Sequence, residues 1–241
     1  MSKTLTIKTG EQRRAIDDKE LFVQGCRILA AEGHAVGLAG QVSLRDGDSN
    51  RMFTLRLGVG LDEAEASAIV RVDDTLRPLD GGGNPNPGAR FHAWIYRHRP
   101  DVKAIVHTHP PATSAFSMLG MPLPVAHMDA CVFHDDCAYL PHWPGVPTGD
   151  DEGRLITETL GRCRRALLAN HGCVCTGSSF EEAIYLAVFA ERTARQCLDA
   201  LAAGPLQPID AAAAQEAHDF LLQPAIVEAT FDYWARRLRA G

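Results

Sequence analysis

The chain has 241 residues, of which 46% are hydrophobic and 22% charged, a composition typical of a folded protein with a full apolar core. The balance of 24 Lys and Arg against 30 Asp and Glu gives a net charge of −6, which argues against a broad nucleic-acid footprint because such a footprint needs clustered positive charge. No apolar run is long enough to span a membrane, and residues 1–14 lack the apolar segment of a signal peptide.

The first part of the chain, up to a loop at residues 81–88, predicts short elements of both kinds. The expected order is a helix, two strands, a short helix and a strand–turn–strand unit, at residues 17–33, 40–46, 51–57, 61–69 and 70–80. The glycines and prolines of residues 81–88 are incompatible with a regular element. A long loop of this kind directly before a helix often lines a site.

Helices and apolar strands alternate after this loop. We expect helices at residues 89–98, 112–119, 153–160, 180–203 and 211–238, and strands at residues 102–109 and 164–170, the second continuing through 171–177 by a turn or bulge. Ser178 or Ser179 is expected to cap the helix that begins at Phe180, and Pro224 to interrupt the last helix. Residues 121–149 predict short strands at most. With no change of composition along the chain, residues 1–241 are expected to form a single domain.

Cysteine usage indicates the compartment. The seven cysteines are an odd number without CxxC spacing, which favours reduced thiols in the cytoplasm over a disulfide framework.

The strongest chemical signal is the pair His107 and His109. Residues two apart on a strand project from the same face, so both imidazoles can bind one ion. Further ligands must come from elsewhere in the chain, and His171, between Asn170 and Gly172 at the end of an apolar strand, is the best candidate. Three neutral imidazoles with an open position are typical of a catalytic zinc-type site. The alternative is that these are coincidental surface histidines.

Other polar residues are candidates for catalysis. His127 and Asp129 fall on one face of a strand-like segment at residues 121–130 and are predicted to be an acid/base pair. The alternatives are a carboxylate that orients a ligand imidazole and a solvated polar face. His92, which faces the same way as Tyr96, and Arg90 are predicted to contact the substrate. Packing explains His92 equally well, and an exposed salt bridge explains Arg90 equally well.

Three motifs carry a resemblance to a known family. The runs GLAGQVSLR, RPDVKAIVHTHPP and LLANHG followed by G-x-S-x-E-E-A together resemble the class II aldolase and adducin-head family, over residues 37–196 and in the expected order. The resemblance implies a three-layer α/β/α fold with a largely antiparallel central sheet, followed by C-terminal helices within residues 178–238. It also implies a homotetramer with sites between neighbouring subunits, and His107, His109 and His171 as metal ligands.

The sequence departs from the sugar-phosphate aldolases of this family in two places. Those enzymes carry a glutamate, as ligand and acid/base, four residues before the histidine that corresponds to His92, where this chain has Gly88. Their phosphate-binding asparagine is replaced by Gln41, and a second phosphate-binding turn by Leu57-Gly58. Cleavage of a phosphorylated sugar is therefore disfavoured.

These observations favour a metal-dependent carbon–carbon lyase, with decarboxylation of a hydroxylated aromatic or related carboxylate as the first choice. Decarboxylation needs no base to begin carbon–carbon cleavage, so it tolerates the missing glutamate. The alternatives are an aldolase for an unphosphorylated hydroxy-carbonyl substrate, an iron-dependent oxygenase and a non-catalytic adducin-like assembly module. One divalent ion is expected, zinc first, with manganese, cobalt or iron as other possibilities.

Overall fold

The computed structural model describes residues 17–143, 145–146 and 148–240, so the segment 1–14, on which the expectation of no signal peptide rested, lies outside it. Seven strands form one mixed sheet in the order β3-β2-β1-β4-β7-β6-β5. The pairing is antiparallel except between β5 and β6. The strands are β1 (Gln41–Arg45), β2 (Met52–Leu55), β3 (Ile69–Val72), β4 (Ala104–Thr108), β5 (Cys137–Leu140), β6 (Arg165–Leu168) and β7 (Gly172–Gly177).

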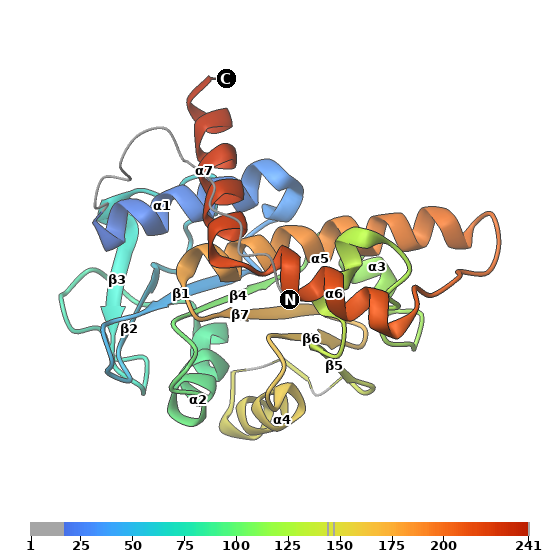
Figure 1. Cartoon of the computed structure of the whole chain (residues 1–241). Coiled ribbons are helices and arrows are strands. Elements are labelled where there is room, and N and C mark those ends of the chain that lie inside the picture. Colours follow the sequence, from blue (N-terminus) through green and yellow to red (C-terminus); the bar gives the residue numbers. More distant parts are fainter. Residues whose placement is uncertain (1–16, 144, 147, 241) are drawn as a thin grey trace.

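Helices cover both faces of the sheet (Figure 1). They are α1 (Asp18–Leu29), α2 (Arg90–His98), α3 (Pro111–Ser117), α4 (Asp150–Leu160), α5 (Phe180–Leu201), α6 (Ala211–Leu221) and α7 (Pro224–Ala240). One apolar core joins the sheet to α1 and α5, and a second joins the other face to α2 and α4. The predicted three-layer α/β/α fold with a largely antiparallel sheet is therefore confirmed.

Helix α5 is the central helix of its layer. Ser179 caps it by accepting a hydrogen bond from the Glu182 N–H at 3.1 Å, which settles the choice between the two serines. Fourteen of its residues are buried, because it lies between the sheet on one side and α1 and α7 on the other. Pro224 begins α7, so the predicted interruption of the last helix separates α6 from α7.

Two segments differ from the prediction. Residues 61–69 form no long helix: they contain a short 3-10 helix, Ala66–Ala68, and Ile69 already begins β3. Residues 121–130 form no strand: Pro122 and Pro124 have no N–H to donate to a ladder, and a 3-10 helix runs from Met128 to Phe133. The His127 side chain caps that helix by accepting from the Asp129 N–H, so these residues do not alternate along a strand.

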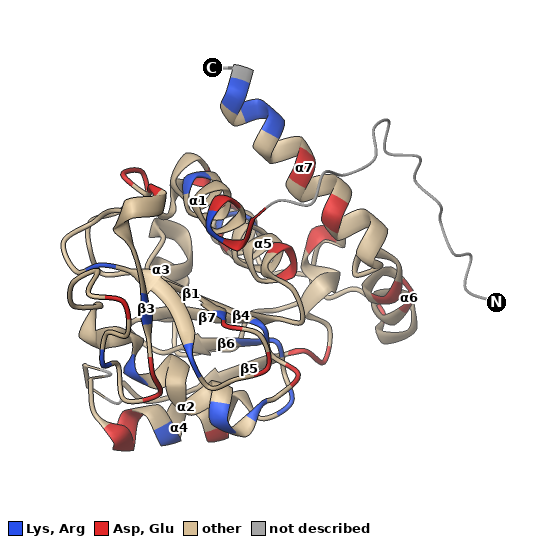
Figure 2. Ribbon diagram, turned by 90° about the vertical axis from the view of Figure 1, so that its left-hand side faces the viewer, with Lys and Arg blue, Asp and Glu red and all other residues tan. Residues whose placement is uncertain are grey.

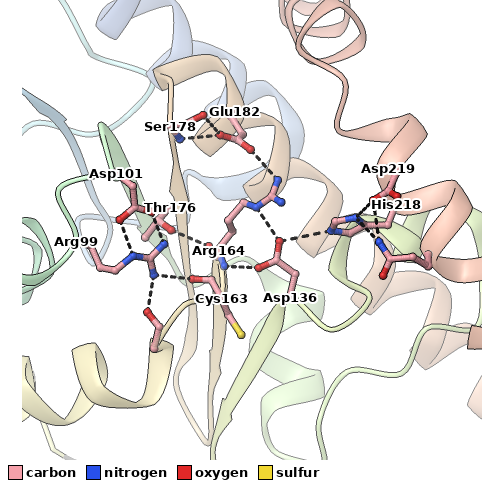
Figure 3. A network of polar contacts seen from close by, with 12 residues as sticks. Arg99, Asp101, Asp136, Cys163, Arg164, Thr176, Ser178, Glu182, His218 and Asp219 are labelled. Atoms are coloured by element: carbon pink, nitrogen blue, oxygen red, sulfur yellow. Dashed lines mark hydrogen bonds and ion pairs between the residues drawn. The ribbon is translucent and has the colours of Figure 1, made fainter. Parts of the chain in front are cut away.

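A polar network fixes the ends of β6 and β7 (Figure 3). The Arg164 guanidinium pairs with Asp136 at 2.8 Å and with Glu182 at 2.9 Å, and its backbone N–H donates to Asp136. His218 on α6 lies 3.7 Å from the same Asp136 carboxylate. This network joins α5 and α6 to the sheet at the end of β7 opposite to His171.

The described residues contain no helix that is both long and apolar enough to cross a membrane. Figure 2 shows Lys and Arg segments interspersed with Asp and Glu segments, and α1 and α4 each carry both signs. The charges are therefore mixed along these helices.

Candidate metal centre

His107, His109 and His171 converge at one edge of the sheet. His107 lies on β4, His109 follows that strand, and His171 directly precedes β7. Strands β4 and β7 are antiparallel neighbours with Thr108 opposite Cys173, so the end of one strand meets the start of the other. The ring centroids lie 4.5–4.9 Å apart, and one potential ligand atom from each ring lies within 4.8 Å of the others. The structure thus brings the three predicted ligands together.

Two residues of the β6–β7 turn allow this approach. Asn170 has a positive φ of 56°, which reverses the chain after β6, so the two strands form a hairpin. A Cβ atom on Gly172 would lie 2.6 Å from the Thr108 carbonyl oxygen and 2.9 Å from the His109 ring. Only glycine fits this contact, because real Cβ atoms do not approach so closely.

Helix α3 connects the two segments that carry the histidines. It begins directly after His109-Pro110, and at its other end Ser117 accepts hydrogen bonds from the N–H groups of Asn170 and His171, through its carbonyl at 3.1 Å and its hydroxyl at 3.2 Å. The Glu191 carboxylate on α5 accepts from the N–H groups of Ala112 and Thr113 in the first turn of α3, at 2.8 and 2.7 Å. Glu191 therefore caps the helix that connects the segments carrying the three histidines.

The three imidazoles are set up as neutral ligands. The Nδ1 of His107 lies 2.9 Å from the Cys173 carbonyl oxygen, so it carries the proton and leaves Nε2 unprotonated. That Nε2 lies 3.0 Å from the Nε2 of His109. Burial lowers the pKa of His107 well below its usual value, lowers that of His109, and lowers that of His171 to about 4. The neighbouring imidazoles lower the pKa of His107 and His171 further.

These observations fit a bound divalent cation. The Nδ1 of His171 is buried and has no hydrogen-bond partner among the described residues, as expected for an atom whose partner is a metal ion. Three neutral nitrogens from three imidazoles match the protein ligand set of a catalytic zinc-type site. They open onto a pocket of about 650 Å³, which leaves room for a small substrate.

The described lining of this pocket contains no charged side chain. Among the described residues it has no Asp, Glu, Lys or Arg. The lining residues are Leu38, Ala39, Gln41, Asn86, Pro87, Gly88, His107, His109, Trp143, Gly145, Val146, Thr148, Asn170 and His171. Within the described lining, a cation held by the histidines would therefore carry the only full charge.

The two predicted substrate contacts lie beside this pocket and not in its lining. His92 is fully buried, its Nδ1 lies 2.8 Å from the Ser43 hydroxyl, and that hydroxyl lies 2.9 Å from Tyr96 Oη. Burial lowers the pKa of His92 to about 3. Arg90 donates from Nε to Asp150 at 2.7 Å at the start of α2, the salt bridge named as its alternative role.

The predicted acid/base pair does not line the pocket either. The His127 Nδ1 is 3.9 Å from an oxygen of Asp129, and the same oxygen pairs with Arg192 of α5 at 2.8 Å. Asp129 belongs to the 3-10 helix Met128–Phe133, which packs against α5 and α6, and His127 is its N-cap. Within one chain, neither residue therefore shares the pocket wall with the three histidines.

The role of Glu191 escaped prediction, and Gln41 was named only as the residue that replaces a phosphate-binding asparagine. Gln41 is buried in the pocket wall with its Cα opposite that of His107 across the β1–β4 pair. Glu191 caps α3 from 79 residues away along the chain. The sequence marked Glu191 only as a carboxylate next to the apolar face of a long helix. The position of Gln41 beside His107 depends on the register of the β1–β4 pair.

The sequence is similar to a known protein family and to several of its characterised members. The profile of the Class II Aldolase and Adducin N-terminal domain matches residues 20–198. A 4-hydroxy-3-prenylphenylpyruvate oxygenase/4-hydroxy-3-prenylbenzoate synthase from Streptomyces roseochromogenus subsp. oscitans is 32% identical over 74% of this chain and 66% of its own length. A 3,4-dihydroxyphthalate decarboxylase from Arthrobacter keyseri is 29% identical over 77% of this chain and 79% of its own length. The chain thus spans about two thirds of the length of the first relative.

A solved structure shares the fold. The L-fuculose 1-phosphate aldolase from Glaciozyma antarctica PI12 superposes with a TM-score of 0.83 at 27% identity, covering 92% of this chain and 88% of the aldolase. The similar proteins thus include a decarboxylase and an aldolase. The family profile covers most of the chain, including all three histidines. The chain therefore belongs to the class II aldolase and adducin family.

Proposed function

We propose that this chain is a metal-dependent carbon–carbon lyase that decarboxylates a hydroxylated aromatic or related carboxylate. The observation that carries the proposal is the set of three neutral histidines in a pocket whose described lining contains no carboxylate. Aldol cleavage requires a base to take a proton from a hydroxyl group, whereas a substrate carboxylate loses carbon dioxide without one. A divalent ion, zinc first, would supply Lewis-acid stabilisation of the negative charge that cleavage leaves on the substrate.

The chain's own residues favour a flat, partly apolar substrate. Leu38, Trp143 and Val146 line the pocket and are more than half exposed, so their apolar surfaces are available to an aromatic ring. Asn170 and Thr148 add neutral hydrogen-bonding groups to the wall. No described lining residue could pair with a phosphate dianion, which agrees with the altered phosphate-binding motifs.

Reprotonation of the product carbon is assigned to His127 or Asp129 as part of this proposal. Since neither lines the pocket of its own chain, this role requires that they serve the pocket of a neighbouring subunit. We accordingly propose a homotetramer, which light scattering would measure, and a cytoplasmic location, which the seven free cysteines support. We also propose that residues 1–241 form a single domain.

An iron-dependent oxygenase is the second candidate, because the 32% identical relative from Streptomyces roseochromogenus is named as an oxygenase. One experiment separates the two reactions. Metal-loaded protein is incubated with a panel of hydroxybenzoates and hydroxyphthalates, with and without oxygen, and carbon dioxide and ring products are measured. A lyase releases carbon dioxide at the same rate without oxygen. Strict dependence on oxygen would replace the lyase by the oxygenase.

A further inference from the structure

Gln41 occupies a special place beside the three histidines. It lies on β1, and its Cα pairs with that of His107 on β4, so both side chains point to the same face of the sheet as cross-strand neighbours. Its side chain is 7% exposed and forms part of the pocket wall. The amide is therefore held in the pocket, next to a residue we assign as a metal ligand.

The amide of Gln41 rests directly on Gly88. A Cβ atom on residue 88 would lie 2.8 Å from Gln41 Nε2, 2.9 Å from Cδ and 3.1 Å from Oε1. Real Cβ atoms essentially never approach closer than 3.0 Å, so a side chain at position 88 would require the Gln41 amide to leave its present place. The Gly88 N–H donates to the Asn86 side chain at 2.9 Å, a bond within the same turn.

The Gln41 amide also has unused hydrogen-bonding capacity. Its Oε1 is buried and has no partner among the described residues. A buried amide oxygen without a hydrogen-bond partner lowers stability, so we expect Oε1 to accept a hydrogen bond when a ligand fills the pocket. This is a second observation that points to a ligand at this position.

The charge of the side chain beside the histidines affects which ligand a bound cation attracts. A protein carboxylate at this place would cancel part of the charge of a bound divalent cation, whereas an amide cancels none. Because the described lining of the pocket has no other charged residue, the charge left on the cation decides how strongly it attracts an anion. A neutral wall therefore favours an anionic ligand that chelates the cation.

We propose that Gln41 is a specificity-determining residue. In contact with Gly88, it keeps the position beside the histidines neutral, and a cation bound there therefore favours a chelating hydroxy-carboxylate anion as its ligand. This inference rests on the proposed metal centre and names the class of ligand that the centre takes. It applies to binding and does not depend on which reaction follows.

The test is Gln41→Glu, which keeps the size of the side chain and adds a carboxylate. Metal-free protein is titrated with Co²⁺, followed by its visible absorption, and the loaded protein is then titrated with 2-hydroxybenzoate. Because a unit charge a few ångströms away is worth at least about tenfold in affinity, we expect Co²⁺ to bind at least about tenfold more tightly and 2-hydroxybenzoate at least about tenfold more weakly. Gln207→Glu makes the same charge change at an exposed loop position and should shift neither affinity by more than about twofold.

The outcomes separate this inference from the metal centre itself. Unchanged 2-hydroxybenzoate affinity in a Gln41→Glu protein that binds Co²⁺ would overturn the role of Gln41. Failure of the wild-type chain to bind Co²⁺ would instead overturn the proposed function. If circular dichroism shows that Gln41→Glu does not fold, the double variant Gln41→Gly with Gly88→Glu places the carboxylate on the other side of the same contact. The same two shifts are then expected, and their absence overturns the inference.

Discussion

Removal of the Glu191 carboxylate should loosen the metal centre from a distance. Its side chain is only 12% exposed and accepts the N–H groups of Ala112 and Thr113 at the start of α3. Pro110, the residue at the N-cap position, has no side chain that could replace it. Glu191→Ala would therefore leave two donors without a protein partner at the helix that follows His109.

The magnitude follows from these two bonds. A hydrogen bond to a charged group contributes about 1.5–3 kcal/mol, and part of the loss is recovered when water reaches the freed N–H groups. We expect Glu191→Ala to lower the free energy of unfolding by about 3 kcal/mol, a large fraction of the usual 5–15 kcal/mol. Because α3 also holds Asn170 and His171 through Ser117, the affinity for Co²⁺ should fall several-fold.

Urea unfolding of the metal-free protein, followed by circular dichroism, measures the first effect, and a Co²⁺ titration measures the second. The control is Glu216→Ala, which removes an exposed glutamate from α6 and should change stability by less than about 0.5 kcal/mol. Glu191→Gln, which keeps one acceptor oxygen, should fall between wild type and alanine. A loss below about 0.5 kcal/mol in Glu191→Ala would refute the capping role.

Three further predictions concern other parts of the chain. Burial lowers the pKa of His34 to about 4 and of His92 to about 3, below the value of about 6.5 in the unfolded chain. Below pH 6.5 the unfolded chain therefore binds more protons than the folded chain, so the free energy of unfolding is highest above pH 6.5 and decreases as the pH falls. Urea unfolding of the metal-free protein should show a free energy of unfolding that is lower at pH 5 than at pH 7 by about 2 kcal/mol per histidine. An unchanged unfolding midpoint would contradict this. Arg165 is fully buried, and its guanidinium lies 4.5 Å from the centre of the Phe133 ring and is surrounded by thiols. Arg165→Met should therefore raise the free energy of unfolding by about 1–2 kcal/mol. A lower stability of the variant in thermal unfolding would show that the charge is compensated. Asp129→Asn should retain the full metal content and lower the turnover rate; loss of metal in this variant would make Asp129 a ligand.

The fold was predictable because its signals are local. Alternating and continuous apolar runs located β4, β6 and β7, and Pro224 located the break between the last two helices. The segment at residues 121–130 misled because its apolar residues alternate as in a strand, while Pro122 and Pro124 remove the donors that a strand requires. Here the missing backbone N–H groups, and not the side-chain pattern, decide the structure.

The grouping of the three histidines was also accessible from the sequence, whereas their surroundings were not. His107 and His109 are two apart on a strand, and His171 stands beside a glycine, so residue type and spacing were enough to group them. The contact of Gln41 with Gly88 depends on which strand pairs with β4 and in what register, which no local pattern records. The capping of α3 by Glu191 likewise depends on how two helices pack against each other.

The central claim is that His107, His109 and His171 hold one divalent ion. It is tested most directly by the metal content per chain, measured by mass spectrometry on protein purified without chelator and then supplied with a slight excess of Zn²⁺, with unbound ion removed. His98→Ala, which removes an exposed histidine of α2 outside the pocket lining, is the control. The account predicts about one ion per chain in wild type and in the control, and almost none in folded His171→Ala. A full complement of metal in His171→Ala would contradict it.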